Sequence, residues 1–75
     1  MEISLDGLRI GQWGTVVSIQ VPPALEHRLR VFGFVPGTRV YCRYRTPCRR
    51  ATALELRGSV IALRTRDMQQ IRVAV

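Results

Sequence analysis

Cysteine and histidine, the usual ligands of zinc, are scarce in this sequence, which has two cysteines and one histidine among its 75 residues. It also has no lysine. Structural zinc sites use four cysteine or histidine ligands in closely spaced pairs. Cys42, Cys48 and His27 are too few and too irregularly spaced for such a site. We therefore expect no metal and no other cofactor. Direct iron(II) binding by these three side chains is a weaker alternative, which an iron(II) affinity near zero would exclude.

Long apolar runs are also missing, although 47% of the residues are hydrophobic. No run approaches the ~20 residues of a membrane-spanning helix. The N-terminal residues MEISLDG lack the basic start and the apolar stretch of a secretion signal. The hydrophobic content is ample for a packed core and argues against disorder. We therefore predict a soluble cytoplasmic protein with a single domain over residues 1–75.

The signatures of catalysis are absent as well. His27 lies on the polar side of an expected helix, and the acidic residues are scattered without a pair suited to acid–base chemistry. No phosphate-binding glycine loop, G-x-S-x-G or H-E-x-x-H motif occurs. A domain of this size leaves little room for a substrate cavity of roughly 300 Å³ or more. We predict that the protein is not an enzyme.

What the sequence does contain is arginine, which supplies all twelve basic residues and a formal net charge of +7. Arginine pairs in a planar, bidentate manner with carboxylates and phosphates. The charge should attract the protein to acidic protein surfaces, anionic lipids or nucleic acid. A GC-rich genome, which favours arginine codons, would also explain the preference for arginine over lysine.

Proline and glycine recur at short intervals, and the segments between them alternate with a period of two, which is typical of short antiparallel strands. The pattern predicts a turn holding Leu5 and Leu8, a helix over 24–32 with an apolar stripe, a helical turn over 65–70, and strands over 15–21, 39–45, 52–57, 60–64 and 71–75. We expect an all-β fold, a small five-stranded SH3-like barrel with one short helix. An OB-like barrel is the main alternative.

Alternation also predicts which side chains share a face. In the first strand we expect Val17, Ile19 and Val21 on one face and Val16 on the other. For Trp13, a position in the core is favoured over a half-exposed one at its edge. In the strand over 39–45 we expect one face of Val40, Cys42 and Tyr44, and an opposite face of Arg39, Tyr41, Arg43 and Arg45.

Two surfaces are candidates for partner binding. One is the helix and the loop after it, and the other is the arginine-rich strand with its adjoining loop. Their candidate residues are Arg28, Phe32, Phe34, Arg43, Arg45, Arg49 and Arg50. A core position for Phe34 is favoured over an exposed one, and the arginine face is equally explained as the solvated outside of a barrel.

The order of short motifs gives a resemblance to a known family. Residues 29–40 read LRVFGFVPGTRV, which is similar to the "L-x-x-L-G-hydrophobic-x-P-G-T-x-V" segment of the FeoA family of bacterial ferrous iron uptake proteins. Nearly the whole chain shares this resemblance, through Leu5, Leu8, Gly11 and Val16, and through the segments RTP (45–47), LRG (56–58), ALR (62–64) and IRV (71–73). The family's "A-P-x-G-D-P" loop is replaced here by TPCRRA over residues 46–51.

The resemblance implies a non-catalytic cytosolic protein that binds and regulates the membrane ferrous iron transporter FeoB through the transporter's cytoplasmic domain. Contact with an anionic membrane surface, peripheral at the inner membrane, is a further expectation from the arginines. The alternative function is a basic β-barrel that binds nucleic acid, which the charge favours and the few expected exposed aromatic residues disfavour.

Overall fold

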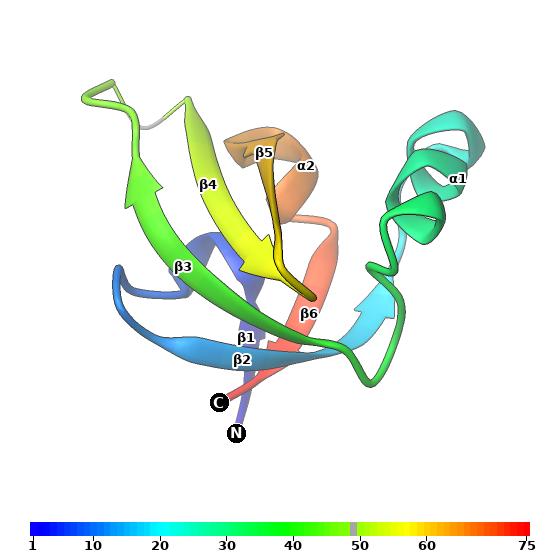
Figure 1. Cartoon of the computed structure of the whole chain (residues 1–75), viewed down its shortest axis with the longest axis horizontal. Helices are drawn as coiled ribbons and strands as arrows, with labels where there is room; N and C mark the ends of the chain where they lie inside the picture. The colour runs from blue at the N-terminus through cyan, green and yellow to red at the C-terminus, as the bar shows by residue number, and fades with distance from the viewer. Residues whose placement is uncertain (49) are drawn as a thin grey trace.

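The computed structural model describes residues 1–48 and 50–75 and consists of one strongly curved antiparallel sheet with a helix beside it (Figure 1). Its strands are β1 (Glu2–Ser4), β2 (Trp13–Ile19), β3 (Arg39–Arg45), β4 (Ala51–Leu56), β5 (Ser59–Arg64) and β6 (Ile71–Ala74). They lie in the order β1-β6-β2-β3-β4-β5. The helical segments are η1 (Leu5–Gly7), α1 (Pro23–Val31) and α2 (Thr65–Met68).

The predicted all-β barrel is confirmed, with six strands in the described residues rather than five. The additional strand is β1, whose three residues pair with the end of β6. Three residues are too few to show an alternating pattern, so this strand could not be predicted from the sequence. Within the described residues, no helix is long and apolar enough to span a membrane.

The core fills the inside of the curved sheet. Leu5 and Leu8, from the predicted turn, are completely buried, and Met68 of α2 also points inward as expected. Around them pack Val16, Leu29, Phe34, Val40, Cys42, Leu54, Leu56, Leu63, Ile71 and Val73. The turn at η1 is closed by a hydrogen bond from the Leu8 amide to the Leu5 carbonyl at 3.0 Å.

A bulge in β2 reverses the predicted faces of that strand. The register between β2 and β6 shifts between Val16 and Ser18, which inserts one extra residue. Val16 is therefore buried and Val17 is exposed, while Ile19 beyond the bulge packs against the core. The prediction that Val17 shares one face with Ile19 was wrong, because a bulge shifts the alternation by one residue.

A second bulge has the same effect in β3. The register between β3 and β4 shifts between Cys42 and Tyr44. Val40 and Cys42 are buried as expected, but Tyr44 is 58% exposed. The expected single face of alternate residues along β3 therefore ends at Cys42.

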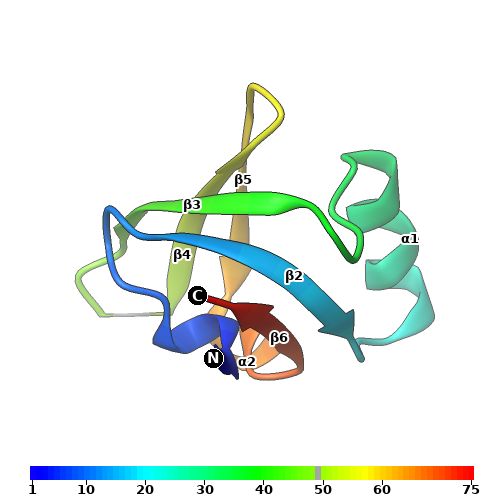
Figure 2. The ribbon, with the colours of Figure 1, turned by 90° about the horizontal axis from the view of Figure 1, so that it is seen from below.

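Helix α1 begins at Pro23, where the missing amide of proline costs nothing, and ends before Gly33. Gly33 adopts a φ of +84°, as a left-handed C-cap requires. The amide of Phe34 then donates to the Leu29 carbonyl at 2.9 Å, which turns the chain back into the core. All residues of α1 are described, and only Leu29 among them is fully buried. In the two views α1 stands beside the strands rather than within the barrel (Figures 1 and 2).

Candidate partner-binding groove

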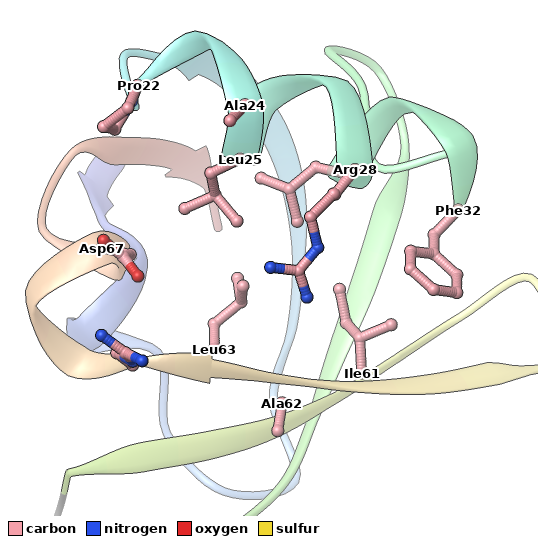
Figure 3. A pocket seen from close by; sticks show the side chains of 11 residues that line it. Pro22, Ala24, Leu25, Arg28, Phe32, Ile61, Ala62, Leu63 and Asp67 are labelled. Carbon is pink, nitrogen blue, oxygen red and sulfur yellow. The ribbon is translucent and has the colours of Figure 1, made fainter.

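A groove of about 420 Å³ lies between α1 and the edge strand β5. We call it the α1–β5 groove. One wall comes from the helix and the other from the strand, and Asp67 of α2 stands at one end (Figure 3). It is lined by Pro22, Ala24, Leu25, Arg28, Leu29, Phe32, Ile61, Ala62, Leu63, Arg64 and Asp67.

The apolar stripe of α1 explains why this groove exists. Leu25, Leu29 and Phe32 follow the i, i+4, i+7 spacing of one helix face. The core covers Leu29, whereas Leu25 is half-buried and Phe32 is 49% exposed. On the strand side, Leu63 is buried and Ile61 half-buried. The helix thus turns more apolar surface towards β5 than the barrel covers.

Arg28 reaches into the middle of this groove. Figure 3 shows its guanidinium between α1 and β5, with Leu25 to one side and Phe32 to the other. Among the described residues, no carboxylate lies within ion-pair distance of Arg28, whereas the neighbouring Arg30 pairs with Glu26 at 3.4 Å. Arg28 is therefore an exposed charged donor group between apolar side chains, available to an anionic group of a ligand.

The turn between β4 and β5 comes close to the segment that follows α1. A Cβ atom added to Gly33 would lie 3.0 Å from Cδ of Arg57, so the Arg57 side chain lies against this glycine.

The arginines of β3 do not form one exposed face. Arg43 pairs with Glu55 of β4 at 2.8 Å. Arg45 is half-buried and donates to the backbone carbonyls of Asp6, at 3.0 Å, and of Leu8. The prediction that Arg45 lies on an exposed contact surface was wrong, because the bulge before Tyr44 turns it towards η1.

Phe34 is likewise not a surface residue. It is 1% exposed and belongs to the core, which excludes it from a direct contact with a partner. Phe32, two residues earlier, is the exposed aromatic residue of this segment. Of the loop arginines, Arg50 is exposed and lies with Arg64 and Arg66 around a second hollow. The predicted site residue Arg49 lies outside the described residues.

Trp13 forms an exposed cluster with two neighbours on β3. It is 45% exposed, so its predicted core position was wrong. Its ring centroid lies 5.0 Å from that of Tyr41, and the guanidinium of Arg39 stacks over it at 4.6 Å. The cluster arises because Trp13 pairs with Tyr41, and Thr15 with Arg39, across β2 and β3.

The two cysteines have opposite surroundings. Burial raises the pKa of the Cys42 thiol, and the nearby Arg45 guanidinium opposes this only in part. Cys48 is exposed, and hydrogen bonds from the Arg50 backbone and the Thr46 side chain lower its pKa. Within residues 1–48 and 50–75, no three cysteine, histidine or acidic side chains come together as a metal site would need.

Sequence reasoning identified Arg28 and Phe32 but missed Leu25, Ile61 and Leu63 as groove residues. The sequence does not show that β5 lies at the edge of the sheet. Without that information, Ile61 and Leu63 are expected to face an ordinary core. The chain reaches β5 some thirty residues after α1, and this strand places Ile61 and Leu63 opposite Arg28 and Phe32.

The sequence profile of the FeoA domain matches residues 3–75. The fold is similar to that of the FeoA protein of Chlorobium tepidum, with a TM-score of 0.94 and 23% identity over 97% of this chain and 70% of that chain. A FeoA-like protein of Clostridium acetobutylicum is 28% identical, with a TM-score of 0.84 over 99% of this chain and 86% of that one. No curated protein matches this sequence.

Stenotrophomonas maltophilia FeoA, which is described as an SH3 domain protein, is 25% identical to this chain. The TM-score is 0.79, over 95% of this chain and 88% of the other. The predicted SH3-like barrel is thus shared with this relative, and the resemblance drawn from the sequence motifs is confirmed. Because the domain profile extends over residues 3–75, this protein belongs to the FeoA family.

Proposed function

We propose that this protein is a non-catalytic regulator of bacterial ferrous iron uptake, and that its α1–β5 groove binds the cytoplasmic domain of the ferrous iron transporter FeoB. The observation that carries the proposal is the groove itself, in which Phe32 and Leu25 leave apolar surface exposed around the unpaired Arg28. Aromatic residues and arginine are the side chains that most often dominate binding energy at protein interfaces.

The family supports the identity of the partner. Stenotrophomonas maltophilia FeoA is described as a candidate activating factor for bacterial ferrous iron transport. A protein of this size can change a transporter only by binding one of its states more tightly than another. A tenfold difference in affinity between two states would shift their equilibrium by about 1.4 kcal/mol. The protein would then act at the cytoplasmic face of the inner membrane.

Two of the side chains that could act in catalysis, His27 and Cys42, do not line this groove, whereas the carboxylate of Asp67 stands alone at one end of it. His27 is exposed on α1 and does not line it, and Cys42 lies in the core. A role in binding rather than in chemistry fits this placement.

The test is calorimetric titration of the purified protein with the purified cytoplasmic domain of the transporter. We expect binding that Phe32→Ser weakens about tenfold or more, because removal of a buried aromatic contact costs roughly 2 kcal/mol. Tyr44→Ser is the matched control, since Tyr44 is an exposed aromatic residue outside the groove. Equal affinities for the wild type and Phe32→Ser would remove the groove from the interface, and no binding by the wild type would refute the function.

A second candidate is nucleic-acid binding, which the cluster of Trp13, Tyr41 and Arg39 favours. A tryptophan and an arginine stacked on an exposed sheet face resemble the platforms on which bases stack in single-strand-binding proteins. Because Trp13 is the only tryptophan, its fluorescence reports directly on this surface. Quenching by a single-stranded oligonucleotide, with an affinity that falls steeply as salt rises, would support this function. Unchanged fluorescence would exclude it.

A further inference from the structure

We propose that the α1–β5 groove binds its partner by strand addition. An extended segment of the partner pairs with the free edge of β5, apolar side chains of that segment contact the helix wall, and a carboxylate of the segment meets Arg28. The inference rests on the proposed function, because it specifies how the partner occupies the same groove.

Strand β5 is a true edge of the sheet. It ends the strand order and pairs only with β4 among the described residues. Strand β5 reads SVIALR over residues 59–64; it contains no proline, and its one charged side chain, that of Arg64, stands at its last position. Proteins usually protect an exposed edge with such residues, because an open edge pairs readily with other chains. The edge of β5 is therefore left open at the groove.

The register shows which backbone groups of β5 are unused. The Thr65 amide donates to the Arg50 carbonyl at 2.9 Å, so the position where these two residues face each other is a hydrogen-bonded pair. Hydrogen-bonded and non-hydrogen-bonded pairs alternate along an antiparallel ladder. The hydrogen-bonded pairs that follow are Thr52↔Leu63, Leu54↔Ile61 and Leu56↔Ser59.

The hairpin turn gives the same assignment from the other end. Arg57 and Gly58 have φ angles of +49° and +80°, as the two central residues of a type I′ turn require. Such a turn closes with a hydrogen bond between the residues that flank it, here Leu56 and Ser59. Two independent features therefore agree on the pattern of the β4–β5 ladder.

It follows that the backbone of Val60 and Ala62, and the amide of Arg64, point away from β4. Ala62 and Arg64 line the groove, so the free edge adjoins the space between β5 and α1. Figure 3 shows the side chains of Ile61 and Leu63 pointing towards α1, so the helix lies over one face of β5 and the free edge runs along the side of the groove. A strand placed there would exchange hydrogen bonds with them, in the mode known as β-augmentation. The half-exposed Phe32 and Leu25 on the opposite wall would contact its apolar side chains.

Charge decides what kind of segment fits. The groove carries Arg28 and Arg64 against the single carboxylate of Asp67, in a chain with a formal charge of +7. A second copy of this chain would bring its own Arg64 and the same net charge to the edge, which opposes pairing of β5 with β5. The occupant is therefore an extended apolar segment of another protein that carries at least one acidic residue.

The direct test is amide hydrogen exchange by NMR on the full chain, alone and with the transporter's cytoplasmic domain. In the free protein the amides of Val60, Ala62 and Arg64 should exchange freely, and those of Ser59, Ile61 and Leu63 should be protected by β4. Complex formation should slow exchange of the first set by about tenfold or more. Binding that alters groove resonances without protecting these amides would refute strand addition and leave the proposed function standing. Absence of binding would refute both.

A matched pair of variants gives a second readout. Ala62→Pro removes the outward amide at the centre of the edge, and proline is tolerated at edge positions whose amide is not needed by the sheet. Ala62→Thr changes the side chain but keeps the amide. We expect Ala62→Pro to weaken binding of the transporter domain about tenfold, with less than about a twofold effect of Ala62→Thr. Equal affinities of the two variants would contradict the proposal. Should Ala62→Pro fail to fold, the exchange experiment decides alone.

Discussion

Arg45 should contribute far more to stability than Arg43, although both lie on β3 two residues apart. The Arg45 guanidinium donates to the carbonyl of Asp6, within the turn η1, and to that of Leu8, directly after it. This turn holds Leu5 and Leu8 in the core, where both are completely buried. Arg45 therefore ties the N-terminal turn to the middle of the sheet.

The magnitude follows from the groups that the substitution Arg45→Ala would leave without a partner. A buried carbonyl that loses a charged donor costs about 1–3 kcal/mol. Because the site is only partly buried, water can replace part of the loss, and we expect about 2–3 kcal/mol for the two carbonyls together. In a domain of this size each kcal/mol lowers the melting temperature by about 4–8 °C, so the melting temperature should fall by roughly 10–20 °C.

Arg43→Ala is the control. Its partner Glu55 is half-buried, but the ion pair lies at the surface, and such pairs contribute about 0–1 kcal/mol. Thermal unfolding followed by circular dichroism compares the two variants directly. Equal shifts of the melting temperature, or a larger one for Arg43→Ala, would refute the assignment of Arg45 as a structural clamp.

Three further predictions concern the core, the helix cap and the cysteines. Leu29→Ala should lower the free energy of unfolding in urea by about 2–5 kcal/mol, because Leu29 is the side chain that anchors α1 in the core. Gly33→Ala should destabilise more than Gly37→Ala. Both have a positive φ that costs about 1–2 kcal/mol, but only at Gly33 would the new Cβ meet another side chain at 3.0 Å. At neutral pH, where a lowered pKa leaves more thiolate, Cys48 should react with iodoacetamide while Cys42 stays unmodified until the protein unfolds, and equal rates in a mass spectrum would contradict the assignments.

The fold was predictable because its determinants are local. Leu5 and Leu8 lie in the turn that their short spacing predicted, which the Leu8 amide closes on the Leu5 carbonyl. The helix bounds were correct to within a residue for the same reason, since Pro22–Pro23 and Gly33 mark its ends. Patterns of this kind depend on neighbours in the sequence alone.

The errors came from features that depend on the partner strand. Val17, Tyr44 and Arg45 were assigned to the wrong faces because bulges occur where two strands pair out of step, and a single strand's sequence carries no mark of this. Trp13 was expected in the core because of its size, yet it lies across from Tyr41 on the outer face of the sheet.

The candidate site was harder to predict than the fold because it lies at an edge of the sheet, beside a strand that has a neighbour on one side only. The sheet has two edges, and the one at β1 is only three residues long. The edge at β5 is six residues long and has an apolar helix standing across from it. Had α1 packed directly onto β5, Leu25, Phe32 and Ile61 would all be buried, and the domain would gain roughly 25 cal/mol for each Å² of apolar surface covered. This small domain has a thin margin of stability, yet these apolar side chains stay partly exposed. Such exposure is expected when a partner supplies the missing contacts.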